Sequence, residues 1–247
     1  MIAVSIVSHG HGIMVQQLVE QVLACPEVER VIVTHNIPEA TNPVSDDRVE
    51  VLSNSSPIGF GANHNLAFLR SREPFWCVLN PDVELVGNPF PVLLEALRGD
   101  SVGLVVPLIV NPAGHVEDSI RHFPTLASLA LKLLGRDNSR YEVDAGSPDF
   151  CPDWVAGMFM MFRADTFAGL NGFDEGYFLY YEDVDICVRL WKAGLKVLAC
   201  PSVSAIHDAR RASRVNWRHG RWHIASMLRY LLKYRGQLPR VDMVHGA

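Results

Sequence analysis

Apolar β-branched runs alternate with helical patterns through the first half of the chain, and this alternation restricts the fold more than any other feature. The pattern predicts strands at Ile2–Val7, Val31–Thr34, Val49–Leu52, Trp76–Leu79 and Val102–Val106, together with helices at Met14–Leu23, Asn63–Arg70 and Pro91–Leu97. A strand–helix–strand rhythm predicts an α/β fold with a mostly parallel sheet and helices on both faces. Ligands bind beyond the carboxyl ends of such strands, so functional residues are expected in the loops that follow them.

The second half of the chain is less regular. Residues 111–153 show weak periodicity with one helical patch at Leu126–Leu134, and long irregular stretches of this kind are often binding loops or lids. Regular patterns then predict a strand from Trp154 to Phe162, a helix near Val184–Ala193, a strand at Lys196–Cys200 and a final helix from about Trp222 to Tyr234.

The bulk properties favour one soluble domain. The chain has 247 residues, 49% of them hydrophobic, with no linker or internal repeat that would divide it. A net charge of −5 gives no reason to expect nucleic acid as a partner. The five cysteines lack metal-ligand or redox spacing, which is typical of reduced thiols in a cytosolic protein. Residues 1–8 lack the basic start of a signal peptide, and the apolar run Val102–Val110 is too short to span a bilayer.

Basic residues are concentrated near the end of the chain. Between His207 and Arg235 there are seven arginines and one lysine, against the single acid Asp208. Such a segment is suited to phosphate groups or to an anionic membrane surface, and it is equally suited to a solvated helix face. The sequence leaves both interpretations open.

One candidate site residue is the aspartate of the Asn80-Pro81-Asp82 motif, which follows the predicted strand Trp76–Leu79. Pro81 cannot continue a central ladder, so the chain turns out at the carboxyl edge of the sheet and presents Asp82 to the crevice. A carboxylate beside phosphate groups is a common way to hold Mg²⁺ or Mn²⁺, because the substrate supplies other ligands. By itself the motif is also typical of an ordinary turn.

The glycine-rich segment Gly59–Asn65 opens the helix after the third predicted strand. Glycines let a backbone approach a ligand closely, and a helix N-terminus favours anionic groups. The segment is not a dinucleotide fingerprint, because His64 stands where a small residue is required. It is therefore a candidate phosphate site, with a simple helix start as the alternative.

Three carboxylates occur within four residues at Glu182, Asp183 and Asp185, just before the helix near Val184–Ala193. Mutual repulsion tends to raise their pKa values, which suits a general base that takes a proton from a hydroxyl. Acids also stabilise a helix N-terminus, and Asp185 has i,i+4 spacing to Arg189. We therefore expect Asp185 to form that ion pair and Asp183 or Glu182 to act chemically.

Three other residues are weaker candidates. His207 ends a short apolar run and has the chemistry of a metal ligand, although a lone histidine is more often structural. Trp154 and Gly157 are candidates for a pocket wall, with core packing as the alternative for the tryptophan.

The order of these motifs resembles that of the family-2 glycosyltransferases, particularly the rhamnosyltransferase-like members that act on cell-surface polysaccharides. The resemblance extends from Ile2 to about Tyr234, and its most specific part is the Asn80-Pro81-Asp82 motif followed by the Glu182–Asp185 block. The other shared elements are Ile2–Ser8, Gly59–Asn65, Trp154–Gly157, Gly172–Glu175, Phe178–Tyr181, Arg189, His207 and Ser213.

The resemblance implies the GT-A fold and inverting transfer of a sugar from a nucleotide diphosphate to a saccharide or lipid-linked acceptor. Rhamnose from dTDP-rhamnose is the donor that the subgroup suggests. Asp183 is in the position of the catalytic base with Glu182 beside it, and Asp82 and His207 are similar to ligands of a divalent metal, Mg²⁺ or Mn²⁺. The residues then expected near the nucleotide sugar are Ser8, Gly59, Gly61, Asn65, Asn80, Asp82, Trp154 and Gly157.

We interpret residues 1–247 as one domain with three parts. Residues 1–110 are expected to bind the nucleotide sugar, residues 111–215 to form the acceptor and catalytic half, and residues 216–247 to form a helical tail. The expected location is the cytoplasm, with peripheral contact to the inner face of the membrane through the basic segment. The oligomeric state stays open.

The chain departs from the family where the nucleoside is contacted. An aspartate followed by asparagine is usual after the second strand, whereas this chain has His35-Asn36, so the nucleotide base stays open. The loss of that aspartate keeps a non-catalytic sugar-nucleotide-binding relative as one alternative. A nucleotidyltransferase is a second alternative, but the loop Ser8–Gly12 lacks the basic residues expected there.

Overall fold

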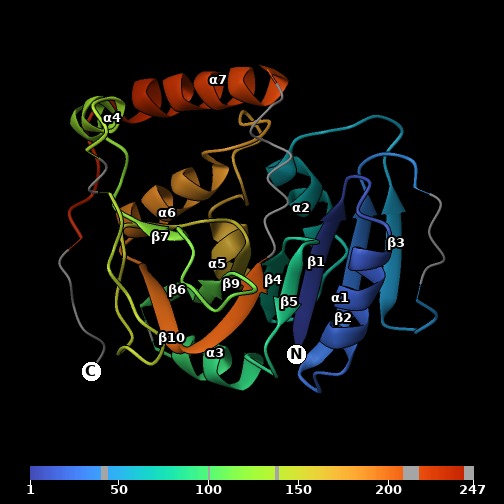
Figure 1. Cartoon of the computed structure of the whole chain (residues 1–247). Coiled ribbons are helices and arrows are strands. Elements are labelled where there is room, and N and C mark those ends of the chain that lie inside the picture. Colours follow the sequence, from blue (N-terminus) through green and yellow to red (C-terminus); the bar gives the residue numbers. More distant parts are fainter. Residues whose placement is uncertain (40–43, 100, 137–138, 208–216, 242–247) are drawn as a thin grey trace.

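The computed structural model describes residues 1–39, 44–99, 101–136, 139–207 and 217–241, and it contains an eight-stranded sheet with helices on both faces (Figure 1). The strands of this sheet are β1 (Ile2–Ser8), β2 (Val28–His35), β3 (Val49–Ser53), β4 (Phe75–Leu79), β5 (Val83–Leu85), β6 (Val102–Val110), β9 (Phe159–Arg163) and β10 (Lys196–His207). The helices are α1 (Ile13–Leu23), α2 (Phe60–Phe68), α3 (Phe90–Ala96), α4 (Leu126–Leu133), α5 (Ala164–Gly169), α6 (Glu182–Lys192) and α7 (Trp217–Tyr234).

The sheet has the order β3-β2-β1-β4-β9-β6-β10-β5. The chain places β2 and β3 on one side of β1 and then returns to place β4 on the other side, and all three pairings are parallel. The strand order therefore reverses between β1 and β4, where α/β sheets form a ligand crevice at their carboxyl edge. Ser8 ends β1 at this edge, and Asn80 follows β4 there.

Two hydrophobic cores cover the two faces of the sheet. Alternate residues of β1 point to opposite faces, so Val4 packs in one core and Ala3 in the other. Helices α1 and α3 pack on the first face, and α2, α5, α6 and α7 contribute to the second. The sheet continues without a break through β4, β9 and β6, and it connects the first 110 residues to the later part of the chain.

The α/β architecture is as predicted, but the predicted strand Trp154–Phe162 is wrong in one respect. The structure divides it into β8 (Trp154–Val155), which pairs with β7 (Ile120–Arg121), and β9, which joins the main sheet. Strand β9 is antiparallel to both β4 and β6, so the sheet is mixed at this point. Apolar periodicity alone did not reveal the break, because both pieces are largely buried.

Other differences concern the ends of elements. Strand β10 extends to His207, beyond the predicted end at Cys200, and α7 begins five residues earlier than predicted, at Trp217. Strand β5 and helix α5 are too short to produce a periodic signal. No helix in the described ranges is both long enough and apolar enough to cross a bilayer.

Helix α6 is connected to α7 through one fully buried carboxylate, that of Asp185. Its oxygens accept hydrogen bonds from Arg189 Nε at 2.7 Å and from Tyr234 Oη at 2.7 Å, and Lys233 Nζ forms an ion pair with it. The predicted i,i+4 pair of Asp185 with Arg189 is confirmed. The two bonds from α7 are contacts that a helical pattern cannot predict, because they come from about fifty residues further along the chain.

We expect Asp185→Ala to lower the free energy of unfolding by about 2–4 kcal/mol, because Tyr234 Oη and Arg189 Nε lose their buried acceptor, while Lys233 keeps its ion pair with Asp174. Urea unfolding monitored by circular dichroism measures this loss. Glu95→Ala is the matched control, since Glu95 is an exposed helical acid in a surface ion pair with Arg98, and it should change stability by less than about 0.5 kcal/mol. Similar midpoints for the two variants would contradict the anchoring role of Asp185.

Candidate functional site

Asp82 lies in the turn between β4 and β5, at the carboxyl edge of the sheet. The turn is held in place by Asn80, whose backbone N–H donates to Met158 O at 2.9 Å and whose carbonyl accepts from Val83 N at 3.2 Å. The side chain of Asp82 is only partly exposed. The Asn-Pro-Asp motif therefore does direct a carboxylate into the crevice, as the sequence predicts.

His207 lies at the end of β10, beside Asp82. Its Nε2 is 3.3 Å from Asp82 Oδ2, and its Nδ1 is 2.9 Å from Glu117 Oε2. Burial alone would lower the pKa of His207, but the two carboxylates raise it above its ordinary value. Burial likewise tends to raise the pKa of Asp82, and the hydrogen bond and charge of His207 lower it overall. The structure thus brings together two residues that are 125 positions apart in the sequence.

The donor atoms at this point suit a divalent cation. The second carboxylate oxygen of Asp82, Oδ1, is buried without a hydrogen-bond partner, so it can serve as a ligand. Glu117 holds the other nitrogen of His207, which is the usual outer partner of a metal-binding histidine. In the described ranges no cluster of three or more His, Cys, Asp or Glu side chains forms a complete metal site. Two protein ligands therefore fit a cation whose remaining ligands come from a bound phosphate group.

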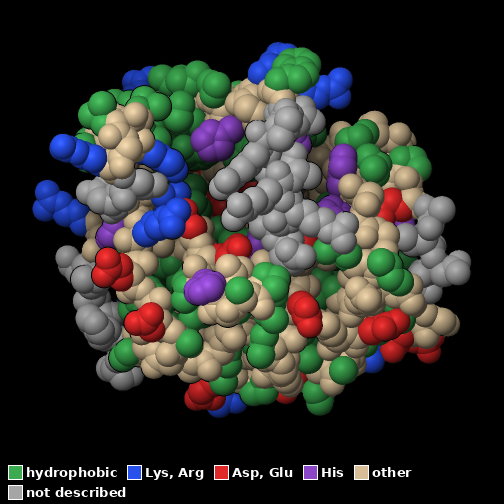
Figure 2. Space-filling view, in the orientation of Figure 1, with side chains coloured by type: hydrophobic (Ala, Val, Ile, Leu, Met, Phe, Trp, Pro, Cys, Tyr) green, Lys and Arg blue, Asp and Glu red, His purple; other side chains and the backbone are tan. Residues whose placement is uncertain are grey.

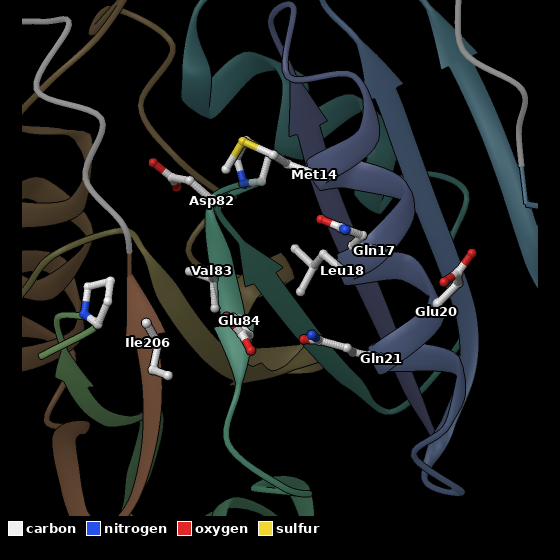
Figure 3. Close-up of a pocket in the computed structure, with 11 residues that line it drawn as sticks. Met14, Gln17, Leu18, Glu20, Gln21, Asp82, Val83, Glu84 and Ile206 are labelled. Carbon is white, nitrogen blue, oxygen red and sulfur yellow. The ribbon is translucent and has the colours of Figure 1, made fainter. Parts of the chain in front are cut away.

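A cavity of about 750 Å³ lies between α1 and β5, with Asp82 at one end (Figure 3). Glu84 and Glu20 also line it, from β5 and α1 respectively. The cavity lining is therefore acidic along its length, from Asp82 to Glu84 and Glu20. A diphosphate approaching Asp82 would be repelled unless a cation neutralised part of the charge.

Asp183 lies in the first turn of α6 and is held by two backbone donors. Its Oδ2 accepts from Gly157 N at 3.1 Å, and its Oδ1 accepts from Val184 N at 2.8 Å. Burial raises the pKa of Asp183 to about 6, and the two backbone N–H groups limit that rise. A carboxylate with this pKa is ionised at neutral pH and still has an appreciable proton affinity, which suits a general base.

Glu182 precedes Asp183 and is buried, with Oε2 lacking a hydrogen-bond partner. Burial, with the neighbouring charges of Asp183 and Asp185, raises the pKa of Glu182 well above its ordinary value. The three acids of this block therefore differ in environment. Asp185 is fully paired, Glu182 is the most strongly driven to the neutral form, and Asp183 faces a groove.

The segment Ala156–Met158 connects the two predicted parts of the site. Met158 O accepts the hydrogen bond from the Asn80 turn, and Gly157 N donates to Asp183. This segment is the break between β8 and β9, so the irregularity that the sequence did not reveal holds the two motifs together. A Cβ at position 157 would lie 3.5 Å from the ring of Phe60 and 3.6 Å from Asp183 Cβ, an ordinary contact distance, so the position does not demand glycine for space.

A groove of about 670 Å³ opens above Asp183, between α4 and α7. Trp154, Tyr180 and Tyr181 line it near Asp183, and Trp154 is fixed there because its Nε1 donates to His122 O at 2.9 Å. The predicted position of Trp154 in a pocket wall is confirmed by this geometry. Its contact with a sugar nucleotide stays a prediction.

The structure gives Gly59, Gly61 and Asn65 a packing role. A Cβ on Gly59 would lie 2.9 Å from Phe178 O, and a Cβ on Gly61 would lie 2.6 Å from Phe173 Cβ. Asn65 Nδ2 donates to Phe173 O at 2.9 Å, and its Oδ1 accepts from Phe173 N at 2.9 Å. These residues join α2 to the loop before α6. Their internal contacts explain the motif without a phosphate, and a contact with the nucleotide stays a prediction.

Ser8 lies at the carboxyl end of β1, and its hydroxyl donates to Glu39 Oε2 at 2.8 Å. Glu39 also accepts from the backbone of Gly10 at 2.7 Å and of Gly12 at 3.3 Å, at the start of α1. Burial would raise the pKa of Glu39, but these hydrogen bonds lower it overall. Sequence reasoning missed Glu39, because a single acid in an irregular segment carries no periodic or motif signal.

Glu117 was also missed, and so was the contribution of α7 to the groove. Glu117 lies in the irregular stretch 111–153, which was predicted to contain binding loops but no particular residue. Met227 and Leu231 of α7 line the groove, although the helix was expected to act through its charges. Three of the eight basic residues behind that expectation, Arg210, Arg211 and Arg214, lie outside the described residues, as does Ser213.

Comparisons with known proteins identify similar sequences over most of the chain. A family described as "N-terminal domain of galactosyltransferase" matches residues 144–213. Rhamnosyltransferase WbbL of Escherichia coli K12 is 30% identical, with 95% of this chain and 94% of the relative aligned. The N-acetylglucosaminyl-diphospho-decaprenol L-rhamnosyltransferase of Mycobacterium tuberculosis is 32% identical over 64% of this chain and 58% of its own length.

Solved structures confirm the fold. GalNAc-T7 with UDP, GalNAc and Mn²⁺ superposes with a TM-score of 0.65 at 16% identity, over 85% of this chain and 44% of that one. The mannosyltransferase PcManGT from Pyrobaculum calidifontis, in complex with GDP-Man and Mn²⁺, has a TM-score of 0.61 at 13% identity, over 92% and 64%. The chain spans less than two thirds of either protein. At these identities the likeness shows the GT-A fold alone.

The raised pKa of Asp183 predicts a pH-dependent gain in stability for Asp183→Asn. Between its ordinary value of 3.8 and about 6, the folded protein holds a proton that the unfolded chain releases, so the wild type loses stability as pH rises through this window. The neutral amide avoids that loss. We expect equal stabilities near pH 4 and an advantage of about 1–3 kcal/mol for the variant at pH 8, measured by urea unfolding at both pH values.

Glu95→Gln, an exposed carboxylate-to-amide change, serves as the control and should show no such trend. If the difference in free energy of unfolding between Asp183→Asn and the wild type did not depend on pH, the pKa of Asp183 would be the same in the folded and unfolded states.

Proposed function

The chain belongs to the rhamnosyltransferase-like family-2 glycosyltransferases, and from this premise we propose that it transfers rhamnose from dTDP-rhamnose to a saccharide hydroxyl, with inversion. The observation that supports this most is Asp183, a carboxylate with a pKa of about 6 that faces a groove. The segment Ala156–Met158 connects it to the Asp82 turn through hydrogen bonds. Such a transfer requires a base for the acceptor hydroxyl and a group that stabilises the leaving diphosphate, here a carboxylate that can hold a cation.

In the proposed reaction the acceptor oxygen attacks the anomeric carbon on the face opposite the diphosphate. The bond from the anomeric carbon to the diphosphate oxygen breaks, and the nucleoside diphosphate leaves with the bonding electrons. Asp183 takes the proton of the acceptor hydroxyl as the new bond forms. Backbone donors Gly157 N and Val184 N hold the carboxylate in position, so little reorganisation is needed at the moment of transfer.

Asp82 and His207 would hold the divalent cation, either Mg²⁺ or Mn²⁺. When bound, the cation supplies neutralisation of the negative charge that develops on the leaving diphosphate. The free Oδ1 of Asp82 and the acidic lining of its cavity support this role. Glu117 would keep His207 Nε2 directed at the cation by accepting from the other ring nitrogen.

We propose a saccharide on a lipid diphosphate as the acceptor, in the synthesis of a cell-surface polysaccharide. The name of the Mycobacterium relative specifies an N-acetylglucosaminyl-diphospho-decaprenol substrate. With an acceptor of this kind the reaction would take place at a membrane surface, and we propose the cytoplasmic face. Ser8 and Asn80, at the carboxyl ends of β1 and β4, and Trp154 and Gly157, near Asp183, remain the residues proposed beside the donor.

Two alternatives make different predictions. A nucleotidyltransferase would release pyrophosphate, whereas the proposed reaction releases a nucleoside diphosphate. A non-catalytic relative would bind the donor without turnover, and no buried acid with a raised pKa would be needed for that task. Measuring the released product distinguishes all three.

Asp183→Asn is expected to lower turnover by about two to four orders of magnitude, because the amide cannot accept the proton. Donor affinity should change little, since Asp183 is assigned to the acceptor side. In the wild type, turnover should fall as pH is lowered through about 6, where Asp183 becomes protonated. Release of dTDP from dTDP-rhamnose measures both effects, with Glu95→Gln as the control, and full activity in Asp183→Asn would contradict the assignment.

Thermal unfolding with dTDP, UDP or GDP, each with and without Mn²⁺, tests the donor site without an acceptor. A nucleotide at about 100 times its dissociation constant should stabilise the protein by about 2.7 kcal/mol. We expect the largest Mn²⁺-dependent shift with dTDP and the loss of that dependence in Asp82→Ala. An Mn²⁺-dependent shift of wild-type size in Asp82→Ala would remove Asp82 from the metal site.

A further inference from the structure

Helices α4 and α7 expose large apolar side chains on the outer surface of the molecule. Leu126, Leu133 and Leu134 on or beside α4 are 73%, 89% and 75% exposed. On α7, Ile224, Leu228 and Leu232 are exposed and follow one another at i,i+4 spacing, which aligns them in one stripe along the helix. Helix α4 buries none of its residues, so its apolar side chains are not explained by the core.

The exposed stripe of α7 is separate from the face that packs on the protein. Ser226, Tyr230 and Tyr234 form the buried face, and Ser226 Oγ donates to Leu179 O at 2.8 Å. The most buried side chains of α7 are therefore polar and aromatic, with Met227 and Leu231 packed partly against the second core, whereas Ile224, Leu228 and Leu232 stay exposed. A surface helix usually directs its aliphatic side chains to the core, so packing within the chain does not explain this second, exposed stripe.

Basic residues accompany these apolar side chains, and neither helix contains an acid. From 126 to 136 and from 217 to 235 the chain has no Asp or Glu, while Lys132, Arg136, Arg218 and Arg221 are exposed. The guanidinium groups of Arg218 and Arg221 lie 5.9 and 5.4 Å from the ring centroid of Trp217, which is itself exposed. Figure 2 shows hydrophobic and basic side chains side by side along the top of the molecule, over α4 and α7.

The same two helices form the walls of the groove that ends at Asp183. Leu129 and Leu133 of α4 face Met227, Leu228 and Leu231 of α7 across it. The mouth of the groove is therefore bordered by the exposed apolar stripes. A ligand that enters the groove from this surface therefore lies in the same groove as the proposed base, Asp183.

We propose that α4 and α7 together form a docking surface for an anionic lipid bilayer, and that the groove between them receives the lipid-linked acceptor from that bilayer. The acceptor part of this inference rests on the proposed function. Leucine and isoleucine side chains would enter the acyl region, with Trp217 at the interface and the lysine and arginine groups on lipid phosphates. No other part of the described chain needs to enter the membrane.

Charge complementarity favours a bilayer over a second copy of the chain. Two copies that met through this face would bring Lys132, Arg136, Arg218 and Arg221 of one against the same residues of the other, with no acids on either helix. An anionic bilayer presents the opposite sign over the whole surface. It also accepts separate apolar stripes, since it needs no complementary shape.

The test is sedimentation of the full chain with phosphatidylglycerol-containing vesicles and with neutral vesicles. The triple variant Leu134→Ser, Ile224→Ser, Leu232→Ser removes apolar side chains that do not line the groove. We expect the wild type to bind anionic vesicles, more weakly in about 0.5 M NaCl, and the triple variant to bind at least about tenfold more weakly. Val86→Ser with Val92→Ser, exposed apolar residues beside and on α3, is the matched control and should bind like the wild type.

Transfer to two acceptors separates this inference from the proposed function. With a water-soluble N-acetylglucosaminyl diphosphate ester, the triple variant should retain wild-type turnover, whereas transfer to the same sugar on a vesicle-bound polyprenyl diphosphate should fall at least about tenfold. Absence of transfer to either acceptor by the wild type would overturn the proposed function and leave vesicle docking to be judged by sedimentation. Equal vesicle binding by wild type and triple variant, or a concentration-dependent dimer that only the triple variant abolishes, would overturn the docking surface.

Discussion

The antiparallel strand β9 is the constraint on which the arrangement of the site depends. It pairs with β4 on one side and β6 on the other, and so joins the β1–β4 half of the sheet to the β6–β10 half. The residues just before it, Gly157 and Met158, donate to Asp183 and accept from Asn80. A shift of β9 by one residue would turn its buried side chains to the other face of the sheet and separate the two acidic motifs.

The three acids at the start of α6 show how one sequence motif can be divided between stability and chemistry. Asp185 forms ion pairs with Arg189 and Lys233 and accepts a hydrogen bond from Tyr234, and it fixes α7 on the protein. In the part of the chain that the structure describes, the donors to Asp183 are backbone N–H groups, which hold its direction and stabilise its charge only in part. The difference lies in which partners each acid meets in the folded chain. Two acids only two positions apart in the sequence therefore have opposite effects on the free energy of unfolding.

The architecture was predictable from the sequence, because buried strands and amphipathic helices produce strong periodic signals. Asp82 was predictable as well, since Pro81 dictates a turn at the end of a buried strand, and Asp183 was expected from the crowding of acids. Glu39 and Glu117 were not predictable, because each lies in an irregular segment and acquires its partners through long-range folding. The break between β8 and β9 was missed for a related reason, since both pieces have the same apolar composition.

The tight contacts of Gly59 and Gly61 affect how an alignment of relatives would be interpreted. A methyl group at either position would collide with Phe178 or Phe173, so selection for a folded chain is sufficient to keep both glycines invariant. Their conservation would then reflect packing against the loop before α6, and it would not depend on which sugar nucleotide is the donor. Covariation of position 61 with position 173 would reveal this steric origin, and relatives with different sugar nucleotides would share the same pair.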